Sequence, residues 1–187
     1  SQKYLEYAYY FEVICYLYFF VSTLLFDNPY TPALYGFFLR IIRTTWPIKF
    51  DKEYLASLLK IESFSFFLYV LLLNLFAKGK VYLLLFPSLI SALIYLLGFH
   101  RRKKELFPLN ITVWIDKIRN YQDYMLNLRS SYDILLLPFT VIGVFFNFNS
   151  FIMPVAYYQL LKLKVKTNES VRGSLIQYRE LFVLYSN

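Results

Sequence analysis

Two apolar stretches separated by only three residues decide the fold: SFSFFLYVLLLNLFA at residues 63–77 and VYLLLFPSLISALIYLLGF at residues 81–99. As an α-helix the first is about 22 Å long, slightly less than the hydrocarbon core of a bilayer, and the second is longer. The connector, KGK at residues 78–80, has room only for a tight turn. The pattern predicts a hairpin of two antiparallel membrane helices over about residues 55–100.

The composition of the whole chain agrees with a membrane environment. Hydrophobic residues make up 58% of the 187 residues and charged residues only 17%, whereas soluble domains have roughly 45–50% and 25%. A soluble domain of this length has too much surface to keep so many apolar side chains away from water. We therefore expect one all-α, multi-pass membrane domain over residues 1–187, built from about three helical hairpins with flanking amphipathic helices.

A second pair of apolar segments precedes this hairpin. Residues 7–26 form a run of 20, YAYYFEVICYLYFFVSTLLF, which is long enough to cross a bilayer. The turn-forming sequence DNPYTP follows at residues 27–32, and a shorter apolar segment returns with Arg40 and Arg43. We expect a hairpin over about residues 5–48, whose second arm either crosses part of the membrane or lies in its interface.

The last apolar block, at residues 134–163, fits either one long tilted helix or two shorter ones. Prolines, a glycine and the sequence NFNS at residues 147–150 interrupt it, and polar residues are least tolerated at the centre of a span. A single span would also place the lysines at residues 162–166 opposite the basic residues 101–104, against the positive-inside rule. We favour a hairpin that keeps both basic clusters in the cytosol.

Two further segments, at about residues 109–130 and 169–185, have the apolar periodicity of helices that lie on a surface. In the second, the apolar stripe consists of residues three or four apart: Val171, Leu175, Tyr178 and Phe182. Such a stripe enters the boundary between headgroups and acyl chains when basic residues accompany it. A helix packed on its own protein has the same pattern, so the periodicity leaves both alternatives open.

Basic residues gather beside the predicted membrane helices, and this placement accounts for much of the net charge of +8. Such clusters mark the cytosolic side and meet anionic lipid there. The sequence therefore predicts the anionic cytosolic leaflet as a partner and makes nucleic acid the poorer explanation of the charge. The predicted membrane-interface residues are the four stripe residues together with Arg101, Arg102, Lys103, Lys104, Lys162, Lys164 and Lys166.

Residues for the common catalytic and cofactor chemistries are scarce. One cysteine, Cys15, and one histidine, His100, cannot build a thiol cluster, a multi-histidine metal site or a His-based triad. His100 follows a long apolar run and precedes four cations, so we expect it to reach toward the interface. The five glycines form no phosphate-binding pattern. We therefore expect no enzyme activity, no metal and no cofactor.

The alternative function is a small transport or channel subunit. It needs polar residues that converge in the middle of the membrane, and the apolar runs offer Glu12, Asn74, Asn147 and Asn149. Glu12 is expected near the interface or against a partner, and Glu62, beside Lys60, is expected at the interface.

Two glycosylation sequons report on the topology: Asn110-Ile111-Thr112 and Asn168-Glu169-Ser170. The hairpin arrangement puts both in the cytosol, where they stay unmodified.

Five stretches also carry a likeness to known proteins. They are ESFSFFLYVLLLNLF from Glu62, LFPSLISALIYLL from Leu85, WIDKIRNYQDYMLNL from Trp114, LLLPFTVIGVF from Leu135 and PVAYYQLLKLKVKTNESVRGSLIQYREL from Pro154. The last is the most specific, because its proline, its tyrosine pair, its basic exit and the helix that follows keep one order and spacing. From Glu62 to Leu181 the chain resembles the transmembrane protein 33 family, whose fungal members are called pore membrane protein of 33 kDa.

The resemblance implies a non-enzymatic, multi-pass protein of the endoplasmic reticulum and nuclear envelope. It also implies reticulon-type proteins or nuclear pore membrane proteins as partners, and a role in tubule shape and in pore distribution or assembly. Composition alone indicates only a multi-pass membrane protein. Composition and resemblance together lead to the hypothesis that the protein shapes or scaffolds membrane.

Overall fold

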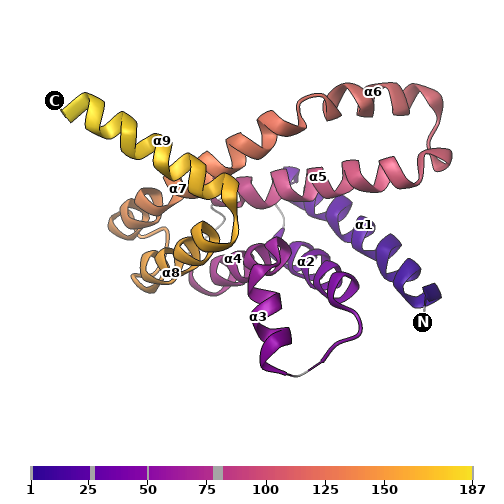
Figure 1. Ribbon diagram of the computed structural model, residues 1–187, viewed down its shortest axis with the longest axis horizontal. Helices are drawn as coiled ribbons and strands as arrows, with labels where there is room; N and C mark the ends of the chain where they lie inside the picture. The colour runs from indigo at the N-terminus through magenta and orange to yellow at the C-terminus, as the bar shows by residue number, and fades with distance from the viewer. Residues whose placement is uncertain (1, 26–27, 50, 78–81, 187) are drawn as a thin grey trace.

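The computed structural model describes residues 2–25, 28–49, 51–77 and 82–186, and within these ranges the chain is helical without a β-strand. Figure 1 shows the arrangement. The α-helices are α1 (Gln2–Leu24), α2 (Tyr30–Thr45), α3 (Lys52–Lys60), α4 (Glu62–Phe76), α5 (Phe86–Arg102), α6 (Leu109–Arg119), α7 (Gln122–Phe145), α8 (Ile152–Thr167) and α9 (Glu169–Ser186); two short 3₁₀ helices are η1 (Tyr82–Leu85) and η2 (Lys104–Leu106).

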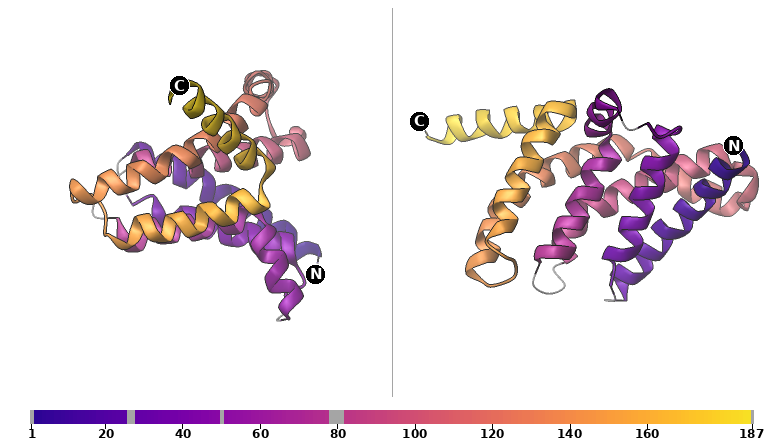
Figure 2. Two further views of the ribbon diagram at one scale, coloured as in Figure 1. Left: turned by 60° about the vertical axis from the view of Figure 1, so that its left-hand side comes forward. Right: turned by 90° about the horizontal axis from the view of Figure 1, so that it is seen from below.

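Four helices lie side by side in one layer, in the order α1, α2, α4, α8, as the right-hand view of Figure 2 shows. Aromatic side chains join neighbouring members of this layer. Phe37 of α2 stacks on Phe66 of α4 with ring centroids 5.7 Å apart, and Tyr69 of α4 meets Tyr157 of α8 at 5.3 Å. Aromatic pairs at these separations stabilise a fold by more than the burial of their surface area alone.

The helices α5 and α7 cross the other side of this layer, where α5 packs on α1 and α7 packs on α5 and α8. The helices α4 and α5 therefore do not pair as closely as a tight hairpin requires. Instead, α4 lies between α2 and α8, because its aromatic residues pack on both of these helices. The expected connector at residues 78–80 lies outside the described residues.

The predicted turn in the last apolar block falls at residues 146–151, between α7 and α8. Asn147 has φ of 59°, in the left-handed region that asparagine tolerates better than most residues. A Cβ on Gly143 would meet the side chain of Asn149 at 3.1 Å, so glycine leaves room for the chain to fold back. The N–H of Ser150 then donates to the carbonyl oxygen of Phe76 at 2.9 Å and joins this turn to the end of α4.

The amphipathic segment expected over residues 109–130 is divided at residues 120–121 into α6 and the start of α7. Arg129, near the end of this segment, is 2% exposed and faces the interior. Residues 122–130 therefore continue into the apolar helix that follows them.

Three helical segments are long and apolar enough to cross a membrane: Lys3–Leu24, Leu83–Arg102 and Gln122–Phe145. The pair α3 and α4, bent by 79° at its break, makes a fourth if it counts as one span. The C-terminal ends of α1, α4 and α7 lie along one edge of the protein, whereas α3 and α9 lie along the opposite edge (Figure 2, right). The molecule therefore has two distinct edges, one formed by helix ends and one by α3 and α9.

Candidate membrane-facing site

The corner between α8 and α9 fixes the start of α9. The side-chain oxygen of Asn168 accepts hydrogen bonds from the backbone N–H groups of Ser170 (3.0 Å) and Val171 (3.3 Å), and so caps the helix. The Asn168 amide nitrogen donates to a carboxylate oxygen of Glu62, the first residue of α4, at 2.7 Å. The hydroxyls of Ser130 and Ser170 lie 2.8 Å apart. The first turn of α9 is thus attached to α4 and α7.

Beyond this turn, α9 extends away from the other helices (Figure 1). Along its predicted stripe, Val171 is buried, Tyr178 is half-buried and Phe182 is 74% exposed. The alternative of a helix packed on its own protein therefore describes the start of α9 only. Its first turn packs on the protein, while its second half presents apolar side chains outward.

The basic cluster at the end of α5 lies near α1 and α6. Lys103 Nζ lies 2.9 Å from Oε1 of Glu6 in α1, and this hydrogen bond raises the pKa of Lys103. Lys104 Nζ lies 3.4 Å from Oδ2 of Asp116 in α6. Two of the four cations are therefore partly neutralised by acids of their own chain. The exposed basic side chains of this cluster are those of Arg101, Arg102 and Lys104.

The three lysines of α8 lie on two different faces of the helix. Lys162 and Lys166 are one helical turn apart and exposed. Lys164 points inward: its side chain is 3% exposed, and its Nζ lies 2.8 Å from Oδ1 of Asp133. Two residues along a helix correspond to a rotation of about 200°, so Lys164 cannot share the outer face of its neighbours. The lipid-facing position expected for Lys164 is therefore not where its side chain lies.

Lys164 belongs to a largely buried network of charged and polar side chains that joins four helices. Asp133 lies one turn after Arg129 on α7, and Arg129 forms an ion pair with Glu62 of α4. Arg129 also donates to the hydroxyl of Ser91 in α5 at 3.1 Å. An unpaired charge is costly in a low-dielectric interior, so this network favours one relative placement of α4, α5, α7 and α8.

A second buried cluster joins α1 to α2. Glu12 is 1% exposed and lies between the guanidinium groups of Arg40 (3.1 Å) and Arg43 (2.8 Å). The Arg40 guanidinium carbon also lies 3.4 Å from the ring centroid of Tyr95 in α5, a cation–π contact. Glu12 thus faces partners, as one of the expectations had it, but these partners belong to its own chain.

The polar residues considered for a transport path are dispersed in the structure. Glu12 forms ion pairs between α1 and α2, whereas Asn149 lies in the turn after α7 and donates to the carbonyl oxygen of Thr140 at 3.1 Å. Asn74 is exposed on α4. In the described ranges, no group of three or more His, Cys, Asp or Glu side chains is arranged to hold a metal ion.

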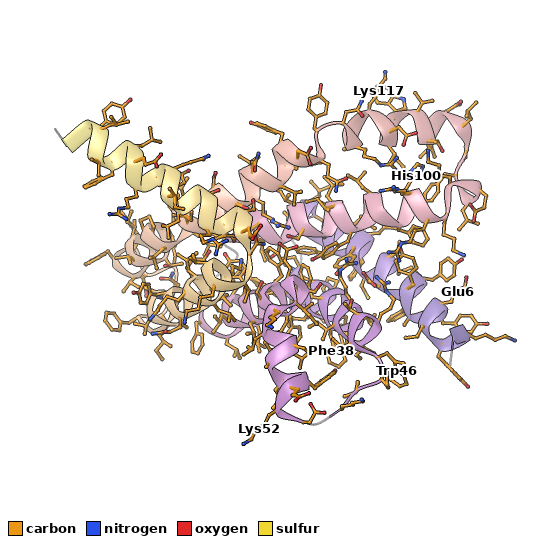
Figure 3. The ribbon with its side chains drawn as sticks, in the orientation of Figure 1. Glu6, Phe38, Trp46, Lys52, His100 and Lys117 are labelled. Carbon is orange, nitrogen blue, oxygen red and sulfur yellow. The ribbon has the colours of Figure 1, made fainter. Side chains whose placement is uncertain are left out.

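His100 is buried rather than extended toward the interface, with an exposed fraction of 1%. His100 belongs to α5, and its ring faces α6 (Figure 3). Its Nε2 is 3.3 Å from the hydroxyl of Thr112, and its Nδ1 is 3.0 Å from a guanidinium nitrogen of Arg119. Its ring also packs against Phe107. Through these contacts His100 helps to pack α6 on α5.

The sequence reasoning missed the pairing of Arg129 with Glu62 and of Asp133 with Lys164. Each of these four residues lies at the border of an apolar run or within one, and acids and bases at such borders tend to pair with one another. That signal was present, but it does not specify which acid meets which base.

The family described as Transmembrane protein 33/Nucleoporin POM33 matches the chain over residues 2–187. No curated protein and no solved structure matches it. The match extends to α1 and α2, which precede the part from Glu62 to Leu181 where the resemblance is strongest. Because the match covers almost the whole chain, and the helices and apolar surface are those of a membrane protein, the protein belongs to the transmembrane protein 33/nucleoporin POM33 family.

Proposed function

We propose that this protein is a non-enzymatic membrane protein of the endoplasmic reticulum and nuclear envelope that shapes or scaffolds the bilayer. The observation that carries the proposal is the position of α9. This helix exposes an apolar stripe at the edge opposite the ends of α1, α4 and α7. An apolar stripe at this edge suits insertion into one leaflet.

The mechanism follows from an asymmetry between the two leaflets. Helix pairs that enter from the cytosolic side and return to it, together with α6 and α9 lying in the interface, add more area to the cytosolic leaflet than to the other. An amphipathic helix reaches only about 5–10 Å into a membrane. The added area on one side favours positive curvature, as in a tubule or at the rim of a pore.

The proposed partners are the anionic lipids of the cytosolic leaflet and reticulon-type or nuclear pore membrane proteins. The exposed basic side chains at residues 101, 102, 104, 162 and 166 support the lipid partner. The family to which the chain belongs carries a nucleoporin in its description, and this supports the nuclear pore partner.

Two experiments test the proposal. Fluorescence imaging of the tagged protein should give signal at the nuclear rim and along reticulum tubules, and signal confined to mitochondria or plasma membrane would contradict the location. Purified protein added to liposomes should tubulate them or prefer small vesicles over large ones. If it does neither, curvature generation is wrong and only the scaffold role is left.

A further inference from the structure

A groove between α7, α8 and α9 combines an apolar lining with two lysines. Its volume is about 650 Å³, within the roughly 300–1,000 Å³ of typical small-molecule sites. Leu135 of α7 and Leu161 of α8 belong to its lining, and α9 contributes Tyr178 and Phe182 from the apolar stripe. The lining is mostly apolar, which suits a hydrocarbon chain better than a polar ligand.

The two lysines, Lys162 and Lys166, line the same groove from α8. They lie one turn apart and are exposed, and in the described part of the chain neither forms an ion pair with an acid, unlike Lys164 between them. An anionic lipid has a charged headgroup and apolar acyl chains. The two cations match the headgroup, and the apolar groove beside them matches an acyl chain. Basic pockets between membrane helices on the cytosolic side bind such headgroups.

Other apolar grooves of the described surface lack this combination. One of about 530 Å³ lies between α1 and α2 and is lined by residues such as Phe11, Tyr18 and Tyr35. Another of about 320 Å³ lies between α4 and α8. Neither has a charged residue in its lining. They can receive any acyl chain, whereas the groove beside Lys162 can also distinguish the headgroup.

We propose that this groove binds one anionic phospholipid, with an acyl chain against Tyr178 and Phe182 and the headgroup phosphate on Lys162 and Lys166. The inference rests on the proposed function, because it requires α8 and α9 to end in the cytosolic leaflet. The bound lipid contacts α7, α8 and α9 together. It therefore holds α9 at a fixed angle to the body of the protein.

The test uses the full chain in mild detergent, incubated with equimolar phosphatidylserine and phosphatidylcholine and measured by native mass spectrometry. The wild type should retain one phosphatidylserine in preference to phosphatidylcholine. K162Q/K166Q should lower this preference about tenfold or more, given the contribution of each cation near an anionic headgroup. The matched control K49Q/K52Q removes the same charge at two exposed positions that do not line the groove, and it should keep the preference.

A third variant separates the groove from the charge. Leu135→Trp fills the apolar lining and should reduce retention of both lipids, while circular dichroism and a single size-exclusion peak show that the chain is folded. Equal retention of both lipids by an inserted wild type, or equal loss in the two double variants, overturns the inference and leaves the proposed function intact. A wild type that is extracted from membranes by carbonate contradicts the proposed function itself.

Discussion

The ammonium group of Lys164 lies 2.8 Å from a carboxylate oxygen of Asp133, and the two side chains are 3% and 1% exposed. The pair connects the C-terminal half of α8 to the middle of α7 in the interior. Each member offsets part of the cost of burying the other. The helices α7 and α8 are therefore joined by an ion pair as well as by apolar packing.

Removing one member of this pair should destabilise the protein strongly. Lys164→Met leaves Asp133 buried without its cation, and we expect a loss of about 3–5 kcal/mol in the free energy of unfolding. Titration with SDS in mixed micelles measures this loss. Lys162→Met, on the exposed face of the same helix, should change it by less than about 0.5 kcal/mol. The double variant Lys164→Met/Asp133→Leu should recover most of the stability, and no recovery would mean that packing around Lys164 matters more than its charge.

The cluster around Glu12 should respond in the same direction. Glu12→Gln removes the charge between Arg40 and Arg43, and we expect a loss of about 2–4 kcal/mol together with looser packing of α1 on α2. Hydrogen exchange in α2, read by mass spectrometry, should rise in this variant. Glu6→Gln removes an acid from the same helix at an exposed position and should leave exchange in α2 unchanged. Equal exchange in the two variants would argue against the cluster as the connection between the helices.

Asn168 combines two contacts that substitutions can separate. Asn168→Ala removes both the cap of α9 and the hydrogen bond to Glu62, at a cost of about 1–2 kcal/mol. Asn168→Ser keeps a capping oxygen but loses the amide donor. We expect proteolysis within residues 169–186 to increase in Asn168→Ala, and to a smaller extent in Asn168→Ser. If the two variants are cleaved like the wild type, the corner between α8 and α9 does not depend on this residue.

The apolar stripe of α9 should be needed for membrane shaping. Phe182→Glu places a charge among exposed apolar residues, and we expect weaker tubulation of liposomes by the full chain, since a charge resists entry into the acyl-chain boundary. Gln177→Glu introduces the same charge away from the stripe and should have little effect. Equal activity of the two variants would show that α9 does not insert through this stripe.

Glycosylation tests the proposed topology, and the structure makes one sequon more informative than the other. The amide nitrogen of Asn168 is engaged by Glu62, so an unmodified Asn168 is expected on either side of the membrane. Asn110 is exposed at the start of α6, and the proposed cytosolic position keeps it unmodified. A glycosidase-sensitive change in mass at Asn110 would reverse the topology. A sequon on a flexible linker inserted within residues 146–151 should be modified and serves as the positive control.

Local sequence predicted the features that depend on composition and periodicity. The apolar runs from Tyr7 and Val81 indicated membrane helices, and segments long and apolar enough to cross a membrane occur at Lys3–Leu24 and Leu83–Arg102. The NFNS sequence indicated a turn, and the chain turns at residues 146–151. These properties follow from residues close to one another in the chain, because helix length and turn formation are local.

Only the tertiary structure decided which helices are neighbours. The sequence suggested that residues 63–77 pack on the stretch that follows, yet α4 lies between α2 and α8. It gave Lys164 the same exposed environment as Lys162, whereas burial beside Asp133 makes it internal. The physical reason is that each apolar helix presents several faces of similar hydrophobicity. The partner of each face is then chosen by shape and by charges that are distant in sequence, which no local pattern records.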